Sequence, residues 1–458
     1  LVGSVSSYFS NHYGTVVDDG MIQNFMETDS SEIFGLASYE LIPYLFFAGL
    51  LPVLFLLRWP IPFQSFRQEC GAKLLVTSLS VLLALIAVAP FTAEYASFLR
   101  EFKPVRYLTT PITPLYSGVR FAFDRLESLS AHAGKPKSRF MDDHVERTVG
   151  DTLPRMFILV VGETARADHF SLNGYPRATN PLLQNQPYVV SLPSVSSCGT
   201  STSVSVPCMF SADDRRHFSK GSIYQELNVL DVLARNDVAV VWRDNNSSSK
   251  GVADRVEYQS FRDARLNPVC DAECRDEGLL DHLEFVVADH PGQDIFLVLH
   301  TMGSHGPEYY KRYPDAFEVF TPTCKTNLLS ECSREEIENA YDNSILYADF
   351  VINSAIEKLK GYQGDFRTSL LYLSDHGESL GEGHVYLHGL PYAFAPESQT
   401  HVAAIAWIPP SSNFDLDRTR EAQMTEYSHD DLFCTVLLSM DVRAKFCHKM
   451  PTLLKRAT

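Results

Sequence analysis

From residue 154 onward, short apolar runs alternate with longer helical stretches. The apolar runs are residues 156–161, 238–242, 295–299, 370–373 and 402–408. The stretches with a helical pattern lie around residues 222–235, 277–288, 334–360 and 428–440. Strands that alternate with helices predict a parallel α/β sheet covered on both faces, and roughly 300 residues suffice for one such core.

The N-terminal part has a different pattern, because two long runs carry no charged residue. They are LIPYLFFAGLLPVLFLL (41–57) and LLVTSLSVLLALIAVAPFTA (74–93). Each is close to the roughly 20 residues that a membrane-spanning helix needs. A pair of buried core helices would give the same pattern. We nevertheless predict two spanning helices, because the runs lie close together and are far more apolar than the rest of the chain.

The segment between these runs carries Arg58, Arg67 and Lys73 against Glu69 alone. Positive residues favour the cytoplasmic side, so we predict a cytoplasmic hairpin loop and an extracytoplasmic region after residue 93. The chain begins at Leu1 rather than Met, and no signal peptide precedes the first run. We therefore expect a further membrane portion before it.

The same patterns divide the chain into three regions. Residues 1–100 form the expected transmembrane region, 101–150 a connecting segment, and 151–458 the large extracytoplasmic domain. The connection is proline-bearing at 104–114 and has a charged helical pattern from about 117 to 132. Aromatic residues before it are expected near the membrane interface: Tyr95, Phe98, Phe102 and Tyr107.

Charge and cysteine usage narrow the class of protein. The net charge of −17 argues against a nucleic-acid binder, since no basic face is evident. Of nine cysteines, Cys70 falls in the expected cytoplasmic loop, where thiols stay reduced, and the other eight lie outside.

Three close cysteine pairs suggest disulfides that close short loops, each worth about 2–3 kcal/mol. They are Cys198 with Cys208, Cys270 with Cys274, and Cys324 with Cys332. Cys434 either pairs with Cys447 or stays a buried free thiol. Zinc–thiolate sites are disfavoured because the chain has no CxxC repeats.

Several predicted strands end in residues that can bind a metal. The first is followed by Glu163, the third leads through His300 to His305, and the fourth ends at Asp375 and His376. His384 and His388 lie further along the last loop. Because carboxyl ends of parallel strands meet at one edge of a sheet, these groups together predict a mononuclear or dinuclear metal site.

A loop rich in hydroxyls, SVSSCGTSTSVSVPC (194–208), offers candidate nucleophiles. A hydroxyl beside a metal ion can attack phosphorus, and a following helix N-terminus can bind phosphate oxygens. A disulfide-closed surface loop would look the same. The pattern alone does not choose among the candidates, which are Thr200, Ser201, Thr202, Ser203 and Ser205.

The longer motifs resemble those of the lipid A phosphoethanolamine transferases, a group that includes the mobile colistin-resistance enzymes. The resemblance covers the whole chain, including the membrane hairpin. It is carried by VVGETARADHFSLNGY (160–175), SCGTSTSVSVPCMF (197–210), LHTMGSHGPEYYKRYP (299–314), YDNSILYADFVI (341–352) and SDHGESLGEGHVYLHGLPYAFAP (374–396). It implies an alkaline-phosphatase-like α/β/α sandwich in the periplasm of a bacterium, preceded by inner-membrane helices.

The resemblance also assigns roles to residues. The zinc ligands would be Glu163, Thr202, Asp375 and His376, with Thr202, four places after Cys198, as nucleophile. His305 and His388 match histidines that hold the phosphoryl group or a second zinc, so one or two Zn²⁺ ions are expected. Lys250 matches a lysine near the phosphate. His384 matches no known role, and His300 is interpreted as structural.

A helix over residues 21–32 would place Asn24, Thr28 and Glu32 on one face. Their spacing alone suggests a solvated helix face. The resemblance instead implies that this face contacts the lipid or ethanolamine part of the substrate.

The resemblance implies a ping-pong reaction by a monomer. Phosphatidylethanolamine would donate phosphoethanolamine to Thr202, and a lipid A phosphate would accept it from there, which lowers the binding of polymyxins. Three alternatives stay open: a phosphoglycerol transferase, transfer to another envelope glycan, and a non-catalytic membrane-anchored binding protein. A sulfatase is disfavoured because no Cys/Ser-x-Pro-x-Arg string occurs.

Overall fold

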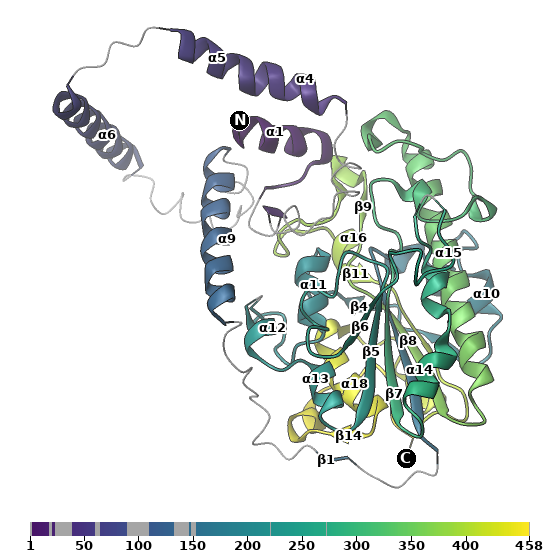
Figure 1. Ribbon diagram of the computed structural model, residues 1–458. Coiled ribbons are helices and arrows are strands. Elements are labelled where there is room, and N and C mark those ends of the chain that lie inside the picture. The colour runs from purple at the N-terminus through teal and green to yellow at the C-terminus, as the bar shows by residue number, and fades with distance from the viewer. Residues whose placement is uncertain are drawn as a thin grey trace.

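A seven-stranded sheet forms the centre of the large C-terminal domain in the computed structural model (Figure 1). The structure describes residues 2–17, 21–22, 39–59, 65–88, 110–131, 146–147, 153–219, 221–271 and 273–457. The strand order is β3-β12-β8-β2-β7-β5-β6. The strands are β2 (Arg155–Gly162), β3 (Val189–Ser191), β5 (Val238–Asp244), β6 (Glu257–Ser260), β7 (Asp294–His300), β8 (Arg367–Ser374) and β12 (Ala404–Trp407).

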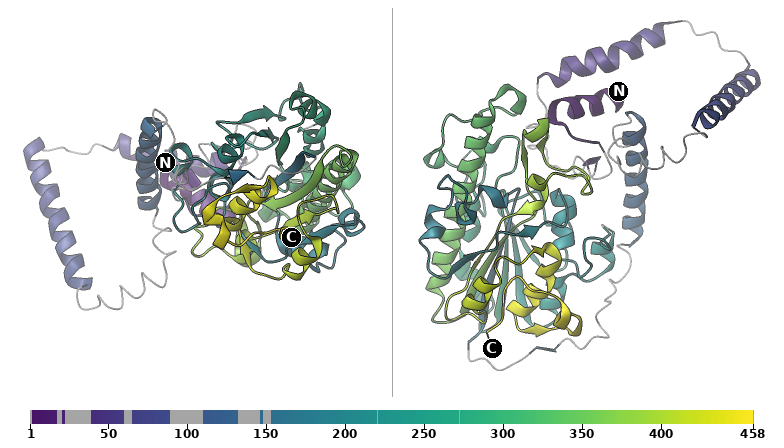
Figure 2. Two further views of the ribbon diagram at one scale, coloured as in Figure 1. Left: turned by 90° about the horizontal axis from the view of Figure 1, so that it is seen from below. Right: turned by 180° about the vertical axis from the view of Figure 1, so that it is seen from behind.

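Helices cover both faces of the sheet, which confirms the α/β sandwich expected from the sequence (Figures 1 and 2). One face packs against α11 (Thr202–Met209), α13 (Val229–Ala234) and α18 (Leu432–Ser439). The other face packs against α10 (Pro181–Gln184), α14 (Leu283–Asp289) and α15 (Arg334–Gly361).

Each central strand is buried on both sides because its residues point alternately to the two faces. In β2, Phe157, Leu159 and Val161 face the α11 side, whereas Met156, Ile158 and Val160 face the α15 side. This explains why these strands read as continuous apolar runs in the sequence.

Smaller elements complete the domain. Short helices are α12 (Ser222–Gln225), α16 (Glu397–Thr400) and α17 (Leu416–Glu421). Two-residue strands are β1 (Glu146–Arg147), β4 (Val195–Ser196), β9 (Ser379–Leu380), β10 (Tyr386–Leu387), β11 (His401–Val402), β13 (Tyr427–Ser428) and β14 (Val442–Arg443).

The sequence pattern predicted a parallel sheet, but one strand of the observed sheet runs antiparallel to its neighbours. The predicted strand 402–408 is divided into β11 and β12, and β12 runs antiparallel to both β8 and β3. After β8, the chain forms the loop 375–400 at the carboxyl edge and re-enters the sheet from that edge. Its next sheet strand must therefore run in the opposite direction.

Two predicted helices are interrupted by local backbone preferences. The stretch 222–235 is two helices, because Asn228 caps α13 by accepting hydrogen bonds from the N–H groups of Leu230 and Asp231. The stretch 277–288 is a 3-10 turn (Asp276–Leu280) followed by α14, with His282 between them in the left-handed conformation at φ +50°. The predicted helix 334–360 is confirmed as α15.

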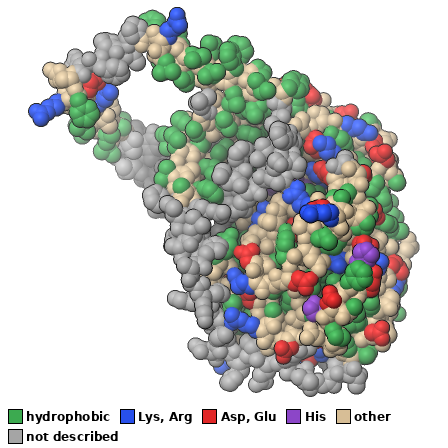
Figure 3. Space-filling view, in the orientation of Figure 1, with side chains coloured by type: hydrophobic (Ala, Val, Ile, Leu, Met, Phe, Trp, Pro, Cys, Tyr) green, Lys and Arg blue, Asp and Glu red, His purple; other side chains and the backbone are tan. Residues whose placement is uncertain are grey.

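Two stretches are long and apolar enough to cross a membrane, Leu41–Arg58 and Phe66–Ala87. The first combines α4 (Leu41–Leu45), a π-helical turn (Phe46–Leu50) and α5 (Leu51–Arg58), and the second belongs to α6 (Phe66–Val88). Their apolar windows are only 6% and 0% buried, so they are not core helices. Figure 3 shows exposed hydrophobic side chains along both. Because α6 begins at Phe66, Cys70 lies in a helix rather than in the predicted loop.

Helix α1 (Val2–Tyr13) lies between α4 and the large domain. Tyr8 packs edge-on against Tyr44 of α4, with ring centroids 5.5 Å apart. On the other side, Gly14 at φ +67° meets the loop of the large domain so closely that a Cβ would lie 2.8 Å from the carbonyl oxygen of His384. Helix α9 (Ile112–Ala131) confirms the helix expected at about 117–132 and begins five residues earlier.

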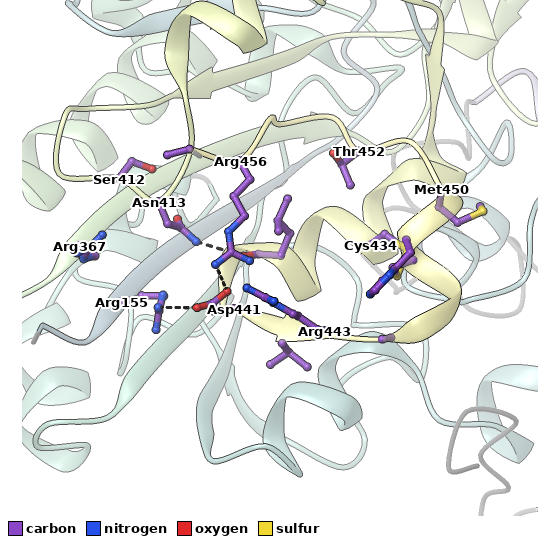
Figure 4. A pocket seen from close by; sticks show the side chains of 16 residues that line it. Arg155, Arg367, Ser412, Asn413, Cys434, Asp441, Arg443, Met450, Thr452 and Arg456 are labelled. Carbon is purple, nitrogen blue, oxygen red and sulfur yellow. Dashed lines mark hydrogen bonds and ion pairs between the residues drawn. A yellow bond between two sulfur atoms is a disulfide. The ribbon is translucent and has the colours of Figure 1, made fainter. Parts of the chain in front are cut away.

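A network of buried charges lies at the amino end of the sheet, opposite the loops described below. Arg155 donates to Asp294 at 3.2 Å and to Asp441 at 3.2 Å, and Asp441 also pairs with Arg456 (Figure 4). These groups lie beside a cavity of about 940 Å³. Arg155 thereby links β2 to β7 through Asp294 and to the C-terminal segment through Asp441.

Replacement of Arg155 by alanine is expected to destabilise the protein by about 3 kcal/mol, because it removes the cation paired with buried Asp294 and leaves buried Asp441 with Arg456 alone. Thermal unfolding followed by tryptophan fluorescence measures this effect, since Trp242 and Trp407 are fully buried. Arg265→Ala is the matched control, because its ion pair with Asp263 is exposed and its loss should leave the melting temperature unchanged. Equal melting temperatures of the two variants would contradict a stabilising role for the buried Arg155 network.

Candidate active site

The carboxyl ends of two neighbouring strands bring the predicted acidic residues together. Strands β2 and β8 pair in parallel with Gly162 opposite Ser374, so Glu163 and Asp375 leave the sheet side by side. The glycines of both motifs are required by close packing, since a Cβ at Gly162 would collide with the Tyr372 ring and one at Gly377 with the carbonyl of Ser398.

Glu163, Asp375 and His376 are completely buried, and one ligand atom of each lies within 4.8 Å of the others. The amide of Asn246 donates to Glu163 Oε2 at 2.8 Å. Asp375 Oδ1 accepts from the backbone N–H groups of Thr164 at 3.2 Å and His376 at 2.7 Å. Asp375 Oδ2, by contrast, accepts no hydrogen bond from any residue that the structure describes.

Hydrogen bonding determines which nitrogen of His376 faces the site. Its Nδ1 lies 2.9 Å from the carbonyl oxygen of Gly377 and must donate there, so Nδ1 carries the proton. Its Nε2 lies 3.4 Å from both Glu163 Oε1 and Asp375 Oδ2. The free lone pair of Nε2 is therefore directed at the two carboxylates, as in a metal ligand.

Burial shifts the pKa of all three groups in the direction that favours the uncharged form. The pKa of Glu163 is raised by burial and by the neighbouring Asp375 charge. Burial raises the pKa of Asp375 to about 6, and burial together with His388 lowers that of His376 to about 4. Two close carboxylates and a neutral imidazole thus share a buried site without a compensating cation among their direct partners.

This donor set fits a divalent metal ion. The two carboxylates supply negative charge, the neutral imidazole supplies a lone pair, and Asp375 Oδ2 is a buried acceptor that the described part of the chain does not satisfy. A bound cation would stabilise the charged forms of both carboxylates.

Thr202 is the hydroxyl that reaches these residues. It is the first residue of α11, and its Oγ1 lies 3.1 Å from Glu163 Oε2 and 3.3 Å from His376 Nε2. The Cys198–Cys208 disulfide closes the surrounding loop. The first N–H groups of a helix have no partner within it, so this N-terminus favours an approaching phosphate.

Other hydroxyls of the loop have different partners. Thr200 Oγ1 donates to the carbonyl of Leu390 at 2.6 Å, and Ser205 donates to the carbonyl of Asp375. Ser201 Oγ lies 3.4 Å from Ser203 Oγ. The structure therefore separates Thr202 from the neighbours that the sequence pattern alone left open.

The two predicted phosphoryl-binding histidines lie beside His376. The rings of His376 and His388 are 4.3 Å apart, and those of His388 and His305 are 5.7 Å apart. Glu378 orients His388, because its Oε2 lies 2.8 Å from His388 Nδ1. His384 is close to this group in sequence but contacts the Gly14 segment instead.

The remaining predicted residues lie at the edge of the site or outside the described chain. Lys250 follows Asn246 by four residues, and its ammonium donates to Ser247 Oγ at 2.8 Å. Asn24, Thr28 and Glu32 lie outside the residues that the structure describes.

Sequence reasoning missed three residues that position the site. Asn246 holds Glu163, and Glu378 holds His388. Glu378 stands inside the motif 374–396 and Asn246 four residues before Lys250, so an amide or carboxylate near a predicted site residue was the available signal. His429 accepts from the N–H of Cys198 at 3.1 Å and donates to the carbonyl of Ser374 at 2.9 Å. Nothing in the sequence marked it, because it follows β8 by more than 50 residues.

The disulfides match the predicted pairing. Cys198–Cys208, Cys270–Cys274 and Cys324–Cys332 are joined, and Cys434 pairs with Cys447, which resolves the alternative left open for that residue.

Comparisons with known proteins agree with this arrangement. The family described as phosphoethanolamine transferase EptA/EptB matches residues 1–126, and the sulfatase family matches residues 155–442. Phosphatidylethanolamine transferase Mcr-2 of Escherichia coli is 40% identical over 97% of this chain and 83% of its own length. Phosphoethanolamine transferase EptA of Escherichia coli K12 is 40% identical over 97% of this chain and 82% of its own length.

One solved structure is similar to this chain over nearly its whole length. The integral membrane lipooligosaccharide phosphoethanolamine transferase A from Neisseria meningitidis superposes with a TM-score of 0.88 at 35% identity. The alignment covers 96% of this chain and 82% of that protein. These relatives are transferases, so the alternative of a non-catalytic binding protein is wrong.

Glu163→Gln should remove most of the bound metal while preserving the fold, because the amide keeps the shape of the side chain but loses its negative charge. Elemental analysis of the purified protein measures the metal content. Glu284→Gln is the control, since Glu284 is an exposed carboxylate of α14 that should not affect the metal. Full metal retention in Glu163→Gln would refute the ligand set.

Proposed function

The chain belongs to the family of phosphoethanolamine transferases, and we propose that it moves phosphoethanolamine from phosphatidylethanolamine to a phosphate of lipid A, with Thr202 as the covalent carrier. The observation that carries this proposal is the position of Thr202. Its hydroxyl lies at a helix N-terminus within 3.3 Å of two of the three candidate metal ligands.

We propose Zn²⁺ as the metal, held by Glu163, Asp375, His376 and the Thr202 hydroxyl. A four-membered set of oxygen and nitrogen donors suits zinc, and the orientation of His376 Nε2 supports it. When bound, the ion supplies Lewis acidity that makes a coordinated hydroxyl easier to deprotonate.

The first half-reaction transfers the headgroup to the protein. Thr202 Oγ1 gives up its proton and attacks the phosphorus of phosphatidylethanolamine. The bond from phosphorus to the glycerol oxygen breaks, and that oxygen takes up a proton as diacylglycerol leaves. Glu163 Oε2 orients the hydroxyl at 3.1 Å, and Asn246 in turn holds that carboxylate. Phosphoethanolamine then stays on Thr202.

The second half-reaction releases it to the acceptor. An oxygen of a lipid A phosphate attacks the same phosphorus, and the bond to Thr202 breaks. His305, His388 and Lys250 are proposed to offset the charge of the phosphoryl oxygens in both steps. The hydrogen bond from His388 to Glu378 holds its ring in place for this role.

The location of the site suits two lipid substrates. Figures 1 and 2 place the carboxyl edge of the sheet on the side of α1, α4 and α5. We propose that residues 1–100 lie in and at the inner membrane, that 101–150 connect, and that 151–458 form the periplasmic catalytic domain. Asn24, Thr28 and Glu32 stay proposed contacts to the substrate. The added amine brings positive charge to the lipid surface, which would weaken binding of polymyxins and other cationic peptides.

Thr202→Ala is expected to abolish the addition of phosphoethanolamine to lipid A, because no other hydroxyl of the loop reaches Glu163 in the described structure. Mass spectrometry of lipid A from cells producing the variant measures the product. Thr202→Ser should keep partial activity, and Thr200→Ala should still form product because Thr200 donates to Leu390 instead. Wild-type product levels in Thr202→Ala would exclude Thr202 as the carrier.

His388→Ala should keep the metal content of the wild-type protein but lower the transfer rate by about 10²-fold, as expected for loss of one group that stabilises phosphoryl charge. Elemental analysis and a transfer assay with a fluorescent phosphatidylethanolamine separate the two effects. Loss of one metal equivalent in this variant would instead indicate that His388 binds a second ion.

A further inference from the structure

His300, interpreted from the sequence as structural, has an unusual setting. It is completely buried, and its Nδ1 lies 2.9 Å from Oδ2 of Asp244, which is also completely buried. The same oxygen accepts a hydrogen bond from the indole N–H of Trp242 at 2.8 Å. Because a carboxylate accepts and does not donate, Nδ1 of His300 carries a proton and the ring orientation is fixed.

The second nitrogen of this ring makes no such hydrogen bond. His300 Nε2 is buried and has no hydrogen-bond partner among the residues that the structure describes. A buried nitrogen without a partner is costly, so its presence needs a reason beyond packing. The hydrogen bond to Asp244 uses only Nδ1, so it does not account for the buried Nε2.

The position of His300 supplies the reason. It is the last residue of β7 and pairs with Asp244 of β5 and with Val161 of β2. Val161 lies two residues before Glu163. Its ring packs edge-on against Trp242 at 5.4 Å, and Trp242 packs against Phe210 at the end of α11, the helix that begins with Thr202. The imidazole thus lies on the face of the sheet that α11 covers, at the edge where Glu163 and Asp375 emerge.

The carboxylates of the site affect the pKa of His300. Burial lowers the pKa of His300, but the charge and hydrogen bond of Asp244, together with the charges of Glu163 and Asp375, raise it above its usual value. In return, His300 is the largest influence that lowers the pKa of Asp375. Asp375 Oδ2 and Asp244 Oδ1 are two more buried atoms of this region that have no hydrogen-bond partner among the described residues.

We propose that His300 is a positioning residue of the metal site, held by Asp244 and Trp242 so that its Nε2–H is directed to the carboxylate ligands and sets how tightly they hold the ion. It supports the arrangement from behind Asp375 and Glu163 and touches neither substrate nor the reacting oxygen. This inference rests on the metal site proposed above and extends it to a second layer of residues.

Two substitutions separate this role from a structural one, because each keeps a different nitrogen. Asparagine in His300→Asn places its amide where Nδ1 was, so it keeps the hydrogen bond to Asp244 and loses Nε2. Glutamine in His300→Gln places its amide where Nε2 was and loses the contact to Asp244. The full chain, stripped of metal and titrated with Zn²⁺ against a chromophoric chelator, reports zinc affinity without any assay of transfer.

We expect His300→Asn to bind zinc about 10–100-fold more weakly than wild type, and His300→Gln to lose about threefold at most. A structural role predicts the opposite order, since only His300→Gln would leave Asp244 without its partner. That order, equal losses in both variants, or wild-type affinity of His300→Asn would overturn the proposal.

Thermal unfolding of the metal-free proteins is the second measurement. His300→Asn should melt within a few degrees of wild type, and a much lower melting temperature without metal would show a structural role and overturn the proposal. Failure of the wild-type protein itself to bind zinc would contradict the metal site, a result distinct from one that contradicts His300 alone.

Discussion

The active-site region depends on one electrostatic constraint, the burial of two carboxylates side by side. Glu163 and Asp375 leave adjacent parallel strands, and neither is exposed. Their direct partners are backbone N–H groups, the Asn246 amide, the Thr202 hydroxyl and a neutral His376. None of these direct partners carries a full positive charge, so a bound cation would stabilise the charged form of the pair.

The surrounding structure serves to hold this pair. The disulfide-closed loop and α11 place Thr202 above it, while His429 links the same loop to the end of β8. On the other side, Glu378 fixes His388 next to His376. Neutral hydrogen bonds from rigid elements therefore set the geometry, and charge is concentrated at the place where phosphate chemistry needs it.

The loop that carries His388 also meets the N-terminal helix. Gly14 approaches His384, and Tyr39 donates to Glu331 at 3.2 Å, so the region next to the membrane helices touches the large domain at two places. The first contact lies four residues before His388. The N-terminal segment and His388 thus meet at one short loop, which relates the position of α1 to that of the site.

The sequence by itself determined the elements whose signal is local. Apolar runs identified β2, β5, β7 and β8, the uncharged runs identified two exposed apolar helices, and close cysteines identified three disulfides. The resemblance of long motifs indicated the family and the set Glu163, Thr202, Asp375 and His376, three of which the structure groups as one possible metal site with Thr202 beside them.

Only the tertiary structure decided the relations between distant segments. The reversed direction of β12 follows from where the loop after β8 returns, and the breaks at Asn228 and His282 follow from local hydrogen bonds and backbone conformation that outweigh an apolar pattern. The roles of His429 and of the Asp244–His300 pair could not be read from composition or spacing. The hydrogen bonds of His300 to Asp244 and of His429 to Cys198 join residues 56 and 231 positions apart, so they depend on strand order and register, which are properties of the assembled sheet.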